Sequence, residues 1–95
     1  MGKIFIDGTK LMHHPDVLAK WKASEFFYPL HVEISPTSAC NHRCILCCVD
    51  YLKHHPQFLS KKNLIDLVTS FAKIGVKSFL LAGEGEPLLN KHVAE

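Results

Sequence analysis

The sequence predicts an α/β fold in which parallel strands alternate with helices. Three patterns carry this prediction: alternating apolar residues at 31–35, a helical apolar period at 60–75, and a strand-like segment at 76–82 that ends in the apolar run 79–82. Apolar residues at every second position indicate a strand, whereas recurrence every three to four positions indicates a helix. A strand, a helix and a second strand in this order form a βαβ unit, whose crossover makes the two strands parallel.

Length and composition limit the chain to one small globular unit. Its 95 residues are 47% hydrophobic and 21% charged, which excludes a disordered or low-complexity chain. A net charge of +2, with Arg43 as the single arginine, provides no basic stripe and therefore no evidence for nucleic-acid binding. The longest apolar run, residues 45–49, is far shorter than the ~20 residues that span a bilayer. Without a secretory signal, we expect a cytoplasmic protein.

Two elements are predicted ahead of the βαβ unit. Residues 3–12 are predicted to form a short hairpin, because Ile4 and Ile6 alternate with Phe5 and because Asp7-Gly8 is a dipeptide favoured in tight turns. Pro15 suits the first turn of a helix, because a missing N–H leaves no bond unmade there. The apolar spacing that follows predicts a helix through about Ala23.

The two strands of the βαβ unit have different patterns. The first, at residues 31–35, places Val32 and Ile34 on one face and ends before Pro36, which cannot donate to a sheet ladder. The second, at residues 76–82, ends in the continuous apolar run 79–82, which predicts that both faces are covered. Because the strands are predicted to be parallel, the loops after them emerge at the edge where α/β proteins bind ligands.

The helix between these strands has the clearest signals in the chain. Ser60 is the predicted N-cap and Gly75 the predicted stop. Apolar side chains follow helical spacing between them: Leu64, Leu67, Val68, Phe71 and Ile74. Residues 36–59, ahead of this helix, show neither period, and loops of that length in compact domains are usually functional.

The four cysteines all lie in that loop, at Cys40, Cys44, Cys47 and Cys48. A disulfide framework would spread them along the chain, so their clustering indicates a metal site. Three thiolates in the spacing C-x3-C-x2-C suit three corners of a cubane cluster and leave the fourth iron open, as in catalytic metal sites. A second interpretation stays open: a closed zinc or iron site of a non-enzymatic electron-transfer module, completed by Cys48 or His42.

These residues resemble the radical S-adenosylmethionine (radical SAM) superfamily, whose C-x3-C-x2-C signature is matched by Cys40, Cys44 and Cys47. That family places its signature after a first strand, as here. It also carries a Gly-Gly-Glu-Pro segment after its second strand. The segment Glu84-Gly85-Glu86-Pro87 stands at that place, with a glutamate instead of the first glycine.

The resemblance implies cofactors and a reaction. The three cysteines would hold a [4Fe–4S] cluster whose fourth iron is chelated by the amino and carboxylate groups of S-adenosylmethionine. Glu86 would contact the ammonium group of this cofactor, Gly85 would allow a close backbone approach, and Leu46 would make an aliphatic contact with the adenine. Reductive cleavage would give a 5′-deoxyadenosyl radical that abstracts hydrogen from an unidentified substrate, with electrons from a reductant such as flavodoxin or ferredoxin.

The resemblance also divides the chain into two parts. Residues 1–30 would be an N-terminal hairpin and helix extension, and residues 31–95 the N-terminal portion of a radical SAM core domain. This portion would be the beginning of a partial (β/α) barrel, truncated after its second strand. A further helix is predicted to begin after Pro87 without a stop signal, so we expect an amino-terminal fragment that is unstable or inactive alone.

Several neighbouring residues are given smaller roles. Cys48 follows the third ligand and is expected to be buried without a role in the site. A shifted ligand set, with Cys48 in place of Cys47, stays open. His42 and Arg43 are expected to be solvated loop residues, although either side chain could tune the cluster. The pairs His13-His14 and His54-His55 do not form ready chelates, because adjacent residues do not share a face.

Overall fold

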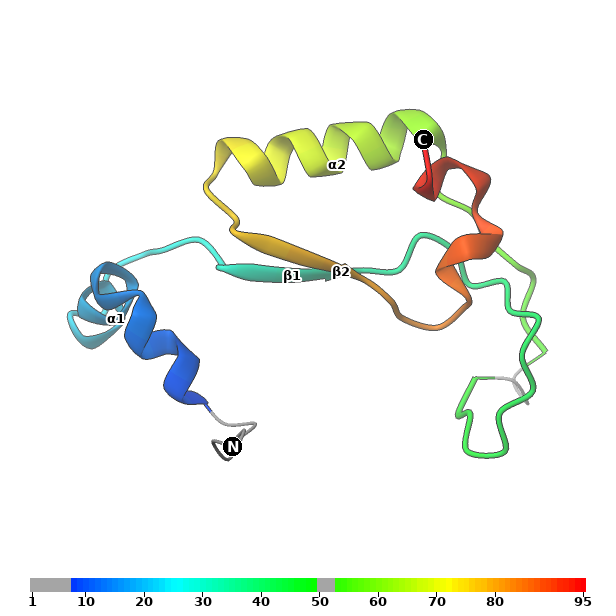
Figure 1. Ribbon diagram of the computed structural model, residues 1–95, viewed down its shortest axis with the longest axis horizontal. Helices are drawn as coiled ribbons and strands as arrows, with labels where there is room; N and C mark the ends of the chain where they lie inside the picture. The colour runs from blue at the N-terminus through cyan, green and yellow to red at the C-terminus, as the bar shows by residue number, and fades with distance from the viewer. Residues whose placement is uncertain (1–7, 50–52) are drawn as a thin grey trace, which may run out of the picture.

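The computed structural model describes residues 8–49 and 53–95. Its elements in chain order are η1 (Gly8–His13), α1 (Pro15–Lys22), β1 (His31–Ile34), α2 (Lys61–Lys73), β2 (Ser78–Leu81), η3 (Pro87–Leu89) and η4 (Lys91–Val93), where η marks a short 3-10 helix. β1 and β2 form a parallel two-stranded sheet, and α2 crosses between them over one face (Figure 1). The predicted α/β class and βαβ unit are therefore confirmed.

β1 and β2 pair in register, with Val32 beside Phe79. His31 Nδ1 and Ser78 Oγ lie 2.8 Å apart, so these two side chains share one face of the sheet. Alternation puts Phe79 and Leu81 on the opposite face, where both line an apolar groove with α2. The sheet therefore presents one face to the helix and the other to solvent.

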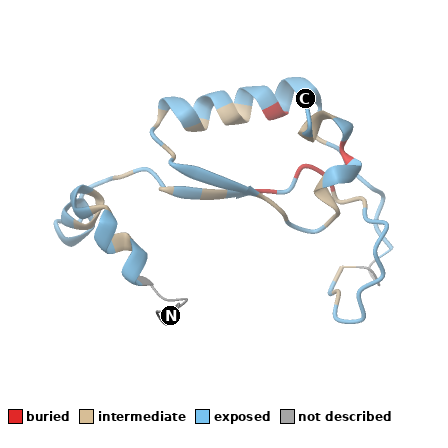
Figure 2. Cartoon of the chain, viewed as in Figure 1, coloured by how far each residue is buried: buried red, intermediate tan, exposed pale blue. Residues whose placement is uncertain are grey.

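The buried core of the described residues is small. Its hydrophobic members are Ile34 on β1 and Leu64 on α2, and Pro36 is fully buried as well. Figure 2 shows how little of the chain is buried. Phe79 and Leu80 remain 46% and 48% exposed, so the predicted burial of both faces of the second strand is wrong. There are two physical reasons. Among the described residues no element covers the face that carries Leu80, and on the other face α2 leaves an open groove beside Phe79.

α2 begins and ends where the sequence predicts. The backbone N–H of Asn63 donates to Ser60 Oγ over 3.2 Å, which is the expected N-cap bond. Gly75 has φ of +86°, a left-handed conformation that glycine adopts without strain and that ends helices. Both boundary predictions are therefore confirmed.

The N-terminal segment corrects one prediction. Residues Gly8–His13 form η1 instead of the turn and second strand of the predicted hairpin, and residues 1–7 lie outside the described part. The N–H of His14 donates to the Leu11 carbonyl over 2.9 Å, so the chain already turns helically before Pro15 opens α1. η1 and α1 lie beyond the start of β1, away from the loops that follow the strands (Figure 1).

The segment after β2 also differs from its prediction. The single helix predicted after Pro87 is replaced by η3 and η4, which Asn90 separates in an extended conformation with φ −82° and ψ 105°. Asn90 is buried, and its side chain bonds to other parts of the chain instead of following the helix surface. In the described ranges, no helix combines the length and apolar character needed to cross a membrane.

Candidate functional site

The loops that follow β1 and β2 meet at one edge of the sheet, as the parallel topology predicts. The N–H of Glu86 donates to the carbonyl of Ala39 over 2.8 Å. At Gly85, a Cβ atom would clash with the Ala39 carbonyl oxygen and approach the Thr37 carbonyl oxygen to 2.5 Å. Glycine is therefore required here to let the segment 83–87 pack directly on the start of the cysteine loop.

The cysteine loop, residues 36–59, is closed at its base by backbone hydrogen bonds. The N–H of Ser38 donates to the Gln57 carbonyl over 3.0 Å, and the N–H of Leu59 donates to the Pro36 carbonyl over 2.9 Å. These two bonds hold the beginning of the loop beside its end. The cysteines therefore lie on a loop whose two ends are hydrogen-bonded to each other.

Thr37 supports this base and is a residue that the sequence interpretation missed. Its Oγ1 donates to the Gln57 carbonyl over 2.7 Å and accepts from the Ala39 N–H over 3.0 Å. The side chain is almost wholly buried, at 3% exposure. The signal that could have found it is the run Ser35-Pro36-Thr37-Ser38, because hydroxyl side chains after a proline commonly bond to nearby backbone.

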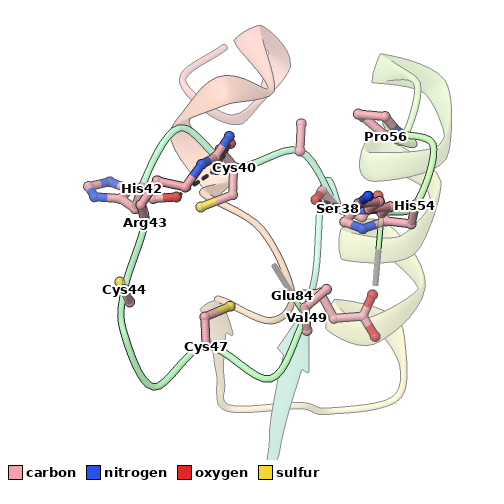
Figure 3. Close-up of a pocket in the computed structure, with 12 residues that line it drawn as sticks. Ser38, Cys40, His42, Arg43, Cys44, Cys47, Val49, His54, Pro56 and Glu84 are labelled. Atoms are coloured by element: carbon pink, nitrogen blue, oxygen red, sulfur yellow. Dashed lines mark hydrogen bonds between the residues drawn. The ribbon is translucent and has the colours of Figure 1, made fainter. Parts of the chain in front are cut away.

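Cys40, Cys44 and Cys47 line one cavity of about 240 Å³ (Figure 3). Figure 3 shows the three thiols spaced around the turn of the loop. Within the described ranges, no three metal-binding side chains gather closely enough to hold a single ion, and all four cysteines are free. Thiolates are the usual ligands of iron–sulfur clusters, so three separate thiols around a shared cavity fit a group with several irons.

The rest of the cavity lining is mainly polar. Its other members are Ser38, Ala39, His42, Arg43, Val49, Lys53, His54, Pro56 and Glu84. The carboxylate of Glu84 extends away from the cysteine sulfurs in Figure 3. The glutamate that replaces the first glycine of the second motif therefore directs its charge away from the thiols.

Cys48 differs from its predicted state. The sequence suggested a buried spectator, but Cys48 is exposed and is not among the described residues that line the cavity. Consecutive side chains leave the backbone in different directions, and Cys47 takes the direction of the cavity. This placement favours Cys47 over Cys48 as the third thiol ligand.

The carboxylate of Glu86 is engaged at both oxygens. Oε1 accepts from the N–H of Leu88 over 3.1 Å, and Oε2 lies 3.2 Å from His42 Nε2. His42, expected to be solvated, keeps 60% of its side chain exposed and still reaches this partner. The contact joins the cysteine loop to the second motif through side chains as well as backbone.

Two further loop residues lie at the surface. Arg43 donates through Nη1 to the His42 carbonyl over 2.8 Å, which braces the backbone between the first two cysteines. Leu46 is 92% exposed, and its contact with an adenine stays a prediction. A side chain this exposed can be covered by a ligand without moving another residue.

Curated proteins similar to this chain bear the name GTP 3′,8-cyclase. The chain is 40% identical over 63 residues to the protein from Psychromonas ingrahamii, which covers 64% of this chain and 18% of that protein. Against the protein from Limosilactobacillus fermentum it is 38% identical over 68 residues, covering 68% and 20% respectively. The chain therefore spans about a fifth of the length of these relatives.

Comparison with known families places both motifs in one family. No solved structure matches the chain. The Radical SAM superfamily matches residues 34–95, which begin at the last residue of β1 and include the cysteines and the Glu84–Pro87 segment. Most of the chain lies in this match. The chain therefore belongs to the radical SAM superfamily, whose members use a [4Fe–4S] cluster and S-adenosylmethionine, the two cofactors that the resemblance implied.

Proposed function

We propose that this chain is the cofactor-binding part of a radical SAM enzyme. The observation that carries the proposal is the direct packing of the second motif on the cysteine loop, through the Glu86 to Ala39 hydrogen bond and the close approach at Gly85. Two motifs far apart in the sequence thereby border one site at the carboxyl edge of parallel strands. Ligands of α/β folds bind at that edge.

Each thiol of the cavity would bind one iron. Cys40, Cys44 and Cys47 would hold three corners of a [4Fe–4S] cluster and leave the fourth iron to S-adenosylmethionine. When bound, the cluster and its cofactor supply the electron and the 5′-deoxyadenosyl radical that abstracts hydrogen from a substrate. The rigid base of the loop keeps the three thiols on one short, closed segment, which reduces the ordering that cluster binding requires.

The second motif would hold the methionine part of the cofactor. Glu86 Oε2, which now faces His42, would accept from the cofactor ammonium in a charge-assisted hydrogen bond. Its other oxygen would remain on the Leu88 N–H, so the carboxylate keeps its orientation. Gly85 would hold the second motif against the cysteine loop, because the Thr37 and Ala39 carbonyls fill the space of a Cβ there. Leu46 is free to cover the adenine.

The remaining assignments extend beyond this chain. The relatives are named GTP 3′,8-cyclase, which makes GTP the first substrate to test. We propose a partial (β/α) barrel as the complete core, a small electron carrier such as flavodoxin or ferredoxin as reductant, and a cytoplasmic location. A reducing compartment would keep the four thiols available for iron.

Single cysteine variants of the full-length protein test the proposal. Cys40→Ala, Cys44→Ala and Cys47→Ala should each lose the cluster after anaerobic reconstitution and form no 5′-deoxyadenosine with dithionite. Cys48→Ala is the matched control and should keep both, since its thiol lies outside the cavity. Equal losses in the control, or a protein that binds zinc and forms no cluster, would instead support the closed metal module.

A further inference from the structure

Asn90 connects three segments that are far apart in the sequence. Its Nδ2 donates to the Pro36 carbonyl and to the Leu59 carbonyl, each over 2.9 Å. Its Oδ1 accepts from the N–H of His92 over 3.1 Å. At 3% exposure it is among the most buried polar residues described, and every polar group of its side chain has a partner.

The two carbonyls that Asn90 binds are the two ends of the cysteine loop. Pro36 is the first residue of the loop, and Leu59 is the last. The Leu59 N–H also donates to the Pro36 carbonyl, so one side-chain amide reinforces the bond that closes the loop. A neutral amide nitrogen offers two donors at one point, which neither a carboxylate nor a hydroxyl can supply.

The backbone of Asn90 is fixed from the other side by the second motif. Its N–H donates to the Pro87 carbonyl over 3.1 Å, and η3 joins it to Glu86, with Glu86 capping the start of η3 and Asn90 its end. Glu86 in turn bonds to Ala39, inside the cysteine loop. The hydrogen bonds therefore run in a closed path that includes both ends of the loop and the segment proposed to hold the cofactor.

We propose that Asn90 is a positioning residue for the cluster site, which clamps both ends of the cysteine loop against the second motif. The proposal rests on the proposed function only for what the loop binds, because the clamp itself consists of hydrogen bonds within this chain. Without the amide donors, the Pro36 and Leu59 carbonyls lose their shared partner. The loop base, although still closed by the bond from Leu59 to Pro36, then opens more readily. Residues that orient metal ligands indirectly typically change metal affinity by about tenfold or more, and we expect that effect here.

Two variants separate the clamp from the helix cap that Asn90 also provides. Asn90→Ser keeps a neutral oxygen for the His92 N–H but lacks both amide donors. Asn90→Asp keeps the shape and the cap oxygen but turns a second oxygen toward two carbonyls. Asn63→Ser and Asn63→Asp are the matched controls, because they make the same two chemical changes at an exposed position in the first turn of α2.

Hydrogen exchange in the metal-free full-length protein gives the first readout. We expect the Leu59 and Ser38 amides to exchange about tenfold faster in Asn90→Ser than in Asn63→Ser, with unchanged exchange inside α2. Equal exchange in both variants would overturn the clamp. Faster exchange throughout, α2 included, would show general destabilisation and would also overturn it.

Cluster retention in the reconstituted protein gives the second readout. Asn90→Ser and Asn90→Asp should each lose iron to a chelator about tenfold faster than the same substitution at Asn63, with an altered paramagnetic resonance spectrum of the reduced cluster. Retention and spectra equal to the control would refute the positioning role while leaving the proposed function intact. If even the unaltered protein builds no cluster, the proposed function fails, and the exchange rates alone decide whether Asn90 clamps the loop.

Discussion

The Glu86 side chain makes one contact within its own segment and one with the cysteine loop. Its Oε1 bonds to the Leu88 N–H at the start of η3, while its Oε2 faces His42 on the cysteine loop. The first contact fixes the carboxylate, and the second marks where a cationic group fits. An ammonium group at Oε2 would take the place of the imidazole.

Replacement of Glu86 by glutamine tests this role. Glu86→Gln keeps an oxygen for the Leu88 N–H but removes the charge, so binding of S-adenosylmethionine should weaken by about tenfold or more, as expected for a hydrogen bond to a charged group. Calorimetric titration of the reconstituted full-length protein measures the change. Glu84→Gln is the control, and an equal loss there would assign the effect to general charge instead of to Glu86.

The sequence predicts the residues with specific chemistry better than the residues that support them. The cysteines and Gly85 belong to motifs with fixed spacing, and the structure places them at the expected edge. Thr37 and Asn90 have no such signal, because their partners are backbone carbonyls that only the folded chain brings near. Hydrogen bonds to distant backbone leave no periodic trace in a sequence.

At the scale of elements, α2 depends on its capping residue. Ser60→Ala removes the oxygen that accepts from the Asn63 N–H and should destabilise the fold by about 1 kcal/mol, the usual cost of losing an N-cap. Ser70→Ala is the same substitution inside α2, where the Ser70 hydroxyl bonds back to the Asp66 carbonyl. Alanine is favoured there, so that variant should be neutral or stabilising.

Urea denaturation of the full-length protein measures both serine variants. The difference in their free energies of unfolding is the quantity to compare, since both changes remove one hydroxyl from the same helix region. If Ser70→Ala destabilised as much as Ser60→Ala, the capping account of α2 would be wrong.

The ion pair between Lys61, at the start of α2, and Glu95, just after η4, should make the stability of the fold depend on pH. A hydrogen bond from Lys61, over 2.7 Å, and then one with His92 lower the pKa of Glu95 below its ordinary value. Because the folded pKa is lowered, the contact stabilises the fold above the ordinary carboxyl pKa and is lost as pH falls through the lowered value. The pair is exposed, so salt should weaken its effect.

Carboxyl titration by nuclear magnetic resonance checks this pair. Lys61→Gln should raise the pKa of Glu95 toward its usual range. Lys62→Gln is the control, because Lys62 pairs with Asp66 instead, at 2.5 Å. A Glu95 pKa that responds equally to both changes would indicate nonspecific charge effects.

Element predictions succeeded where local signals agree and failed where distant contacts decide. The N-cap, apolar period and terminal glycine of α2 all lie within its own sequence, and its bounds follow them. The predicted hairpin around Asp7-Gly8 is replaced from residue 8 onward by η1, which continues toward α1. The predicted final helix is broken at Asn90, whose bonds to the cysteine loop outweigh helical continuation.

At the scale of the whole molecule, the described part has little buried apolar surface. Two-stranded sheets need more strands or further packing for independent stability, and here Phe79 and Leu80 remain about half exposed. Exposed apolar side chains on an open sheet also favour self-association. These features suit a sheet that is completed by additional strands, as in the proposed barrel.

The 95 residues expressed alone should therefore show marginal stability. We expect a broad, non-cooperative thermal transition by circular dichroism, because Ile34 and Leu64 are the buried hydrophobic residues of the described core. The full-length protein is the control and should unfold cooperatively. A sharp transition in the 95-residue chain, together with cleavage of S-adenosylmethionine, would contradict this expectation.

The central claim is that three cysteines hold a cubane whose fourth iron stays open for a cofactor. Paramagnetic resonance of the reduced, anaerobically reconstituted full-length protein, with and without S-adenosylmethionine, tests it most directly. We predict about four irons per chain and a spectrum that changes when the cofactor is added, since ligation of one iron alters the electronic structure of the whole cluster. A spectrum unchanged by the cofactor, or stoichiometric zinc in place of iron, would contradict the claim.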